Sequence, residues 1–126
     1  MNLKHVNTYQ MLSIVDEIAN VTPNISFLDI VTKAYIAKEY TDLDFSEYVQ
    51  DGNVDLIAIY DQVIDIWDSI VKVVGLTKIV NVEKLAMARY KELNSMENKL
   101  IDFVEKMYEF SALKNQVGVE HENDNK

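Results

Sequence analysis

Residues that interrupt helices are scarce in this chain. Its 126 residues include three Gly and one Pro, too few for a barrel or sandwich of many short strands, which needs a turn roughly every 8–12 residues. Apolar residues make up 48% of the sequence and charged residues 26%, a balance typical of a globular domain that buries its own core. The sequence therefore predicts an all-α protein, a single-domain bundle of four to five helices over residues 1–113.

The first helix has a clear start signal. Asn7, with Gln10 three residues later, resembles a capping box, and apolar residues then recur at helical spacing. Pro23 disfavours helical backbone in the residue before it, so this helix should end near Asn20.

Two further helical segments should follow. Ser26 with Asp29 forms a second capping box, whose helix we expect to run to about residue 40. A short helical turn should cover residues 45–49, and Asp51-Gly52 should end it.

Residues 53–75 form the most apolar segment. Asn53 is the expected N-cap, and Gly75 is suited to the left-handed conformation that stops a helix. At about 100° per residue, the apolar side chains cover more than half of this helix, with Trp67 near their middle. A helix this apolar is normally surrounded by others, so we expect it at the centre of the bundle. The narrow polar sector that remains holds the carboxylates of Asp61, Asp65 and Asp68.

The longest predicted helix covers residues 81–113. It carries a heptad-like apolar stripe made of Leu93, Met96, Leu100, Phe103, Met107 and Phe110. A straight helix of this length would be roughly 50 Å long, so it should bend, overhang the core or pack against another copy. The stripe therefore predicts a self-association seam, with packing inside the chain as the open alternative. Residues 114–126 are mostly polar and predict a disordered acidic tail.

The net charge of −9 is concentrated in one segment. Residues 1–38 and residues 69–126 each contain equal numbers of acidic and basic side chains, whereas residues 39–68 contain no Lys or Arg. The acids of this segment are Glu39, Asp42, Asp44, Glu47, Asp51, Asp55, Asp61, Asp65 and Asp68.

Two interpretations of this acidic segment remain open. In the first, the acids cap helices and keep a polar face hydrated. In the second, they dock a basic protein partner or imitate a nucleic-acid backbone. The partner-binding residues would then be Glu39, Asp42, Asp44, Glu47, Asp51, Asp61, Asp65 and Asp68, with Tyr40, Phe45 or Tyr48 as apolar anchors.

No catalytic or metal-binding motif stands out. The chain has no Cys and only isolated Gly residues, which excludes thiolate chemistry and glycine-rich phosphate loops. Calcium loops that start at Asp42 or Asp51 fail, because Glu47 or Leu56 occupies the sixth position, where Gly is needed. We therefore expect a protein that is not an enzyme and that takes no cofactor or metal.

No motif identifies a family. In size, acidity and helical content the chain is similar to two classes of virus-encoded accessory protein, small inhibitors of host defence nucleases and tail-assembly chaperones. The first resemblance implies a protein-binding module that docks a positively charged, nucleic-acid-binding protein through the Glu39–Asp68 surface. The second implies an assembly chaperone or structural oligomer, such as a homodimer, that uses the 93–110 seam.

Charge and hydropathy set further expectations. A net charge of −9 with a single Arg argues against direct binding of nucleic acid, which needs clustered cations. Targeting signals and long uncharged apolar runs are absent from the sequence, so we expect no membrane association and a cytoplasmic location.

Overall fold

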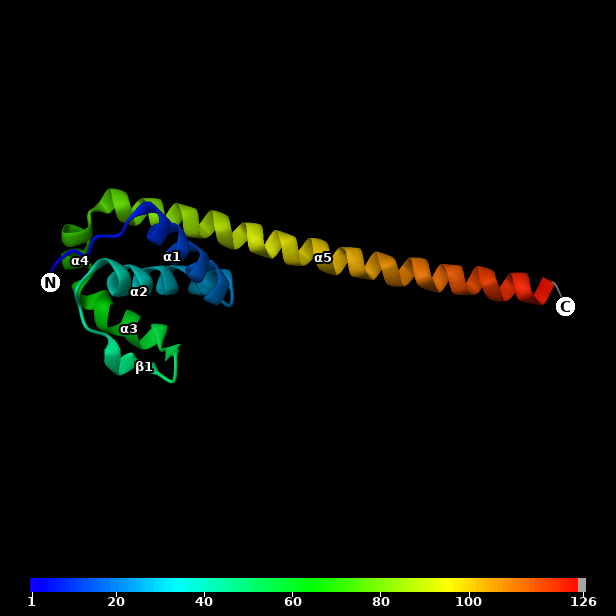
Figure 1. Cartoon of the computed structure of the whole chain (residues 1–126), viewed down its shortest axis with the longest axis horizontal. Helices are drawn as coiled ribbons and strands as arrows, with labels where there is room; N and C mark the ends of the chain where they lie inside the picture. The colour runs from blue at the N-terminus through cyan, green and yellow to red at the C-terminus, as the bar shows by residue number, and fades with distance from the viewer. Residues whose placement is uncertain (125–126) are drawn as a thin grey trace. The chain divides into compact units, whose positions relative to one another are not determined.

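The computed structural model describes residues 1–124, together with their side chains except those of Glu97 and residues 113–124. The described chain is helical apart from its connecting segments and one short hairpin, which confirms the all-α prediction (Figure 1). Two compact units are formed, Met1–Lys91 and Glu92–Lys126. The domain limits expected from the sequence, residues 1–113, stay a prediction.

Helix α1 covers Thr8–Val21 and begins as the sequence predicts. The Gln10 amide donates to Asn7 Oδ1 at 2.8 Å, and the Asn7 amide donates to Gln10 Oε1 at 2.9 Å. This reciprocal capping box satisfies two backbone donors that would otherwise lack partners at the helix start.

Helix α2, Leu28–Tyr40, follows a 3-10 turn, η1, at Ile25–Phe27. The predicted cap at Ser26 is wrong, because Asn24 caps this turn by accepting the Ser26 amide at 3.0 Å. The fully buried side chains of α2 include Ala34, Ile36 and Ala37.

The connection after α2 contains the short helical turn that the sequence predicts, η2 at Ser46–Tyr48. It continues into an antiparallel hairpin that sequence reasoning missed, in which β1, Val49–Gln50, pairs with β2, Asn53–Val54. The turn residues Asp51 and Gly52 both have positive φ, 52° and 80°. Asp-Gly is a preferred pair for such a two-residue hairpin turn.

The helix predicted over residues 53–75 is interrupted. It consists of α3, Leu56–Val63, the 3-10 turn η3, Ile64–Ile66, and α4, Trp67–Val74. Asp55, and not Asn53, caps α3, because Asp55 Oδ1 accepts the Ala58 amide at 3.1 Å. The 3-10 turn winds the backbone more tightly than an α-helix and so changes which side chains of α4 face the core. Gly75 ends α4 as predicted, but its φ of 97° and ψ of 131° lie outside the left-handed helical conformation that the sequence led us to expect.

The expectation that residues 53–75 lie at the centre of the bundle is also wrong. Ile57, Ile64 and Ile66 of this segment are exposed. Helix α2 is instead the central element, because it packs against both α1 and α3 (Figure 1).

Helix α5 covers Leu76–Asp124 and begins five residues before the predicted start at Asn81. Its first turns bury Ile79, Val82 and Ala86 in the core of the first unit. The backbone stays helical through residues 114–124, where the sequence predicts a disordered tail. Disorder of that segment stays a prediction for measurement in solution, and residues 125 and 126 lie outside the described residues.

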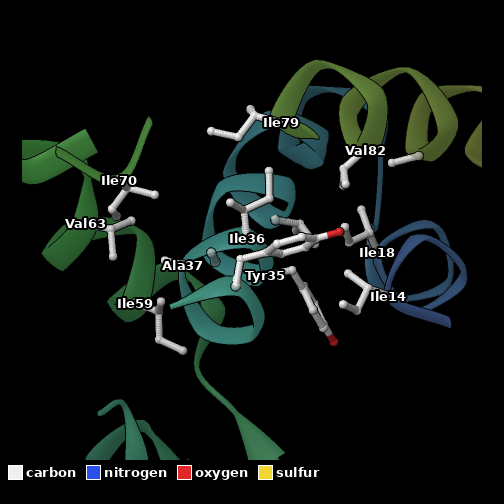
Figure 2. Packing of buried hydrophobic residues seen from close by; sticks show 14 of the residues in the cluster. Ile14, Ile18, Tyr35, Ile36, Ala37, Ile59, Val63, Ile70, Ile79 and Val82 are labelled. Carbon is white, nitrogen blue, oxygen red and sulfur yellow. The ribbon is translucent and has the colours of Figure 1, made fainter. Parts of the chain in front are cut away.

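One hydrophobic cluster joins the helices of the first unit. Figure 2 shows Ile18 of α1, Ile36 of α2 and Val82 of α5 converging, with Ile59 and Val63 of α3 on the other side of α2. All five side chains are almost completely buried. The first unit is therefore a helical domain whose surface loops and short helices carry the acidic segment.

Candidate protein-interaction surfaces

Several acids of the 39–68 segment have structural partners. The carboxylate of Asp42 accepts the Asn2 backbone amide at 2.7 Å and the Asn2 side-chain amide at 3.0 Å. The hydrogen bond from the Asn2 backbone is the main reason why the pKa of Asp42 is lowered. Asp42 therefore fastens the N-terminal segment beside the end of α2, where Leu3 and Thr41 form a β-bridge.

Three further acids serve local structure. Asp44 accepts the Ser46 amide at 2.9 Å, which lowers the pKa of Asp44. Asp55 caps α3, and the carboxylate of Glu39 lies 2.7 Å from Lys38 Nζ. For Asp44 and Asp55 the structure supports the first interpretation of the segment, in which the carboxylates cap helices and turns, whereas Glu39 is held in an ion pair.

Glu47 forms a hydrogen bond with Tyr48, and the other four acids are free of such roles. Asp51, Asp61, Asp65 and Asp68 are exposed, and among the described residues none of them forms a hydrogen bond or ion pair through its carboxylate. Asp51 lies in the hairpin turn, and the other three lie on α3, η3 and α4 in succession. The 3-10 turn η3 breaks the continuous helical face on which the sequence places Asp61, Asp65 and Asp68.

A surface hollow of about 410 Å³ lies beside the hairpin. Glu47, Tyr48, Asp51 and Asp55 line it, and Val54 forms part of its wall. The pKa of Tyr48 is raised by partial burial first, then by a hydrogen bond with Glu47 and by the charges of Glu47 and Asp55. Carboxylates around an aromatic ring make a suitable environment for an ammonium or guanidinium group.

The aromatic anchors expected from the sequence differ in exposure. Tyr48 is half-buried and lines the hollow. Tyr40 is only 5% exposed and Phe45 only 9%, and both belong to the hydrophobic core. The prediction of Tyr40 or Phe45 as a surface anchor is therefore wrong. The sequence could not separate these three side chains, because Tyr40 is buried by the packing of α2, and the hairpin beside Tyr48 was not predicted.

The stripe predicted for self-association lies on α5 within the second unit. Leu93 is half-buried, and the remaining members, Met96, Leu100, Phe103, Met107 and Phe110, are between 54% and 67% exposed. Sequence reasoning missed that the apolar surface is wider than this stripe. Ile101, Val104 and Tyr108 are also exposed, and a plot at 100° per residue would have placed them beside it.

The described residues form neither a metal-binding cluster nor a membrane-spanning helix. Over the part of the chain that the structure describes, His, Asp and Glu side chains form no cluster of three or more that could hold a metal ion. None of the helices described here is both long and apolar enough to cross a membrane.

Comparisons with protein-family models, with curated proteins and with solved structures found no match to this chain. The interpretation of its surfaces therefore depends on the residues themselves.

Proposed function

We propose that this protein is a non-enzymatic binding module that docks a basic protein partner through the acidic surface of its first unit. The observation that carries the proposal is the set of four exposed carboxylates without structural partners, Asp51, Asp61, Asp65 and Asp68. Solvation alone does not require that residues 39–68 contain no Lys or Arg. Such a field of one sign accelerates encounter with a surface of the opposite sign and repels competitors.

The hollow beside the hairpin gives this surface a point of attachment. A Lys or Arg side chain of the partner would lie against Tyr48, within reach of the carboxylates of Glu47 and Asp51. The combination of aromatic contact and charge-assisted hydrogen bonds favours Arg over Lys at this position.

The chemistry of such a partner leads to a possible role. Proteins that bind nucleic acids present clustered cations to phosphates. A module that covers those cations with its own carboxylates inhibits the partner by competition, without any catalytic step. The alternative role, an assembly chaperone or structural oligomer, is favoured by a separate observation, the exposed apolar surface of α5.

A charge-matched pair of variants tests the docking proposal. The first variant carries Asp51→Asn, Asp61→Asn, Asp65→Asn and Asp68→Asn. The control carries Glu83→Gln, Glu120→Gln, Glu122→Gln and Asp124→Asn, which change the net charge equally outside the acidic segment and outside the apolar surface of α5. Both should keep the helical circular-dichroism spectrum of the unmodified protein.

The measurement is affinity capture from cells that express the tagged chain, followed by titration of the captured protein at several salt concentrations. We expect the first variant to lose capture and the control to keep it, with affinity falling steeply as salt increases. Equal capture by both variants would contradict the proposal, since binding would then follow total charge or an apolar contact.

A further inference from the structure

The exposed apolar side chains of the second unit cover one half of the α5 surface over residues 98–112. With Leu100 at 0° and about 100° per residue, the apolar side chains fall between roughly −80° and +100°. They are Leu100, Ile101, Phe103, Val104, Met107, Tyr108 and Phe110. The charged side chains Lys99, Asp102, Glu105, Lys106 and Glu109 all fall on the other half. Over residues 98–112, α5 is therefore an amphipathic helix whose apolar half is exposed.

The exposed apolar area of this half is comparable with the area that one partner buries in a protein interface. Its side chains, with Met96, are 41–75% exposed. An aromatic side chain has roughly 150–250 Å² to bury and an aliphatic one has less, so at these exposures the eight side chains offer somewhat less than about 900 Å² of apolar surface. Monomeric proteins seldom expose an apolar patch above about 300–600 Å², and a standard interface buries about 800 Å² on each partner. The surface is large enough for one stable dimer contact.

At the beginning of α5, side chains with the same spacing are covered by neighbouring helices. Ile79, Val82 and Ala86 follow the same alternation of three and four residues, and Ala86 precedes Leu93 by one heptad. In the first unit these three side chains are almost completely buried against neighbouring helices. The continuation in the second unit has the same character and lacks a covering helix among the described residues.

The charges that border the apolar half are complementary to those of a second copy. Lys99 and Lys106 lie near one edge, at roughly −100° and −120°, and Glu105 lies beyond the other edge, at roughly 140°. In two parallel helices related by a twofold axis, opposite edges of the two copies face each other, whereas in an antiparallel pair like edges do. A parallel copy thus brings the Lys edge toward the Glu edge, and an antiparallel copy brings Lys toward Lys.

We propose that the apolar half of α5 over residues 98–112 is the interface of a parallel homodimer, in which the same residues of two copies face each other. This interface is independent of the acidic surface proposed for docking, because the two use different residues. The seam is wider than the narrow heptad stripe, with Leu100, Val104 and Met107 along its centre.

Sedimentation equilibrium on the full chain tests the dimer. We expect the unmodified protein to have twice the monomer mass at micromolar concentration. Leu100→Glu should weaken dimerisation at least 100-fold, because it places a charge at the centre of the seam. Asn98→Glu adds the same charge on the opposite half of the helix and should leave the dimer unchanged. Trp67 fluorescence reports whether the first unit stays folded in each variant.

Disulfide trapping tests the parallel arrangement. The sequence contains no native Cys, so only the introduced thiols can form a cross-link. Leu100→Cys and Met107→Cys, each introduced alone, should cross-link two copies under mild oxidation, because only a parallel in-register pair places both positions opposite themselves. Glu109→Cys, on the polar half, should not cross-link. A monomeric parent at 100 μM, or a dimer that Leu100→Glu leaves intact, would overturn the interface. A dimer that cross-links through only one of Leu100→Cys and Met107→Cys, through neither, or equally well through Glu109→Cys would overturn the parallel in-register pairing.

Discussion

Arg89 Nε donates to Asp16 Oδ1 at 2.8 Å and so connects the beginning of α5 to α1 within the first unit. The two side chains are 34% and 55% exposed, and an ion pair in such contact with water contributes only about 0–1 kcal/mol. We therefore expect Asp16→Asn to lower the free energy of unfolding by less than about 1 kcal/mol, as measured by urea denaturation at low salt.

The matched comparison is Ile18→Ala, one half-turn further along α1. Ile18 is completely buried, and truncating such a side chain costs about 2–5 kcal/mol. If Asp16→Asn were the more damaging change, the attachment of α5 to α1 would depend on the ion pair and not on the apolar cluster.

The side chain of Trp67 contributes to the packing of α4 against the core. Its side chain is half-buried, packs against the core and lies under Lys33, whose Nζ is 5.4 Å from the ring centroid. The sequence places Trp67 fully inside the bundle, for which truncation to Ala costs about 3–5 kcal/mol. Because part of the ring is exposed, we expect Trp67→Ala to cost about 2–3 kcal/mol in urea denaturation.

A control for this prediction removes the cation. Lys33→Met keeps most of the aliphatic stem over the ring and removes the charge, and with it the ion pair of Lys33 Nζ with Asp29 at 3.1 Å. The two losses together should cost no more than about 1 kcal/mol. A cost for Trp67→Ala below that of Lys33→Met would show that the ring contributes through the cation and not through the core.

Gly75 joins α4 to α5 in a backbone conformation with positive φ. Its φ of 97° and ψ of 131° follow the end of α4 and precede α5. L-residues seldom adopt this conformation, so Gly75→Ala should lower stability by about 1–3 kcal/mol. A Cβ at Gly75 would meet no atom within 4 Å, and the whole cost would therefore be conformational.

Gly52 in the hairpin turn is the natural comparison. Its φ is 80°, again with nothing within 4 Å of an added Cβ. The hairpin turn is exposed, whereas Gly75 joins two helices that both contribute to the core. We expect Gly52→Ala to cost about 1 kcal/mol. A larger effect at Gly52 than at Gly75 in thermal unfolding would contradict this ranking.

Local signals in the sequence account for much of the fold. The capping box of Asn7 and Gln10 and the stop at Gly75 are decided by neighbouring residues, and both are found as predicted. The 3-10 turn η3 is different, because no Gly or Pro marks it. It is favoured by tertiary packing, which buries Val63 and Ile70 on either side of the turn.

The acidic segment shows a similar limit. Its composition reveals the excess of carboxylates, but the sequence alone could not identify which of them have partners. Asp42 is satisfied by Asn2, a residue 40 positions away. The hollow around Tyr48 depends on the Asp51-Gly52 hairpin, a signal that was present and was interpreted as a helix end. The acids of the candidate site could thus be predicted from the sequence. Which of them have structural partners and which are free could not be predicted.

The last prediction concerns alkaline pH and the phenol of Tyr35. Tyr35 is 7% exposed, and its pKa is raised above 10.0 by burial first, then by the charge and hydrogen bond of Glu17 and by the charge of Glu39. The folded protein therefore holds this proton at a pH where the unfolded chain has released it. The contribution of the neutral phenol to stability is fully present below about pH 10. It should be lost as the pH rises from there through the pKa of Tyr35 in the folded protein.

Urea denaturation between about pH 8 and pH 11 measures this loss, and Tyr35→Phe should reduce its slope, because no phenol remains to ionise at that position. Tyr40, whose pKa is also raised by burial, should account for a further part, so the double variant with Tyr40→Phe should be the flattest. Tyr9→Phe is the matched control, since Tyr9 is 86% exposed, and it also corrects for lysine deprotonation in the same range. If the slope of Tyr35→Phe equalled that of Tyr9→Phe, burial of the phenol beside Glu17 would not be the source of the alkaline loss.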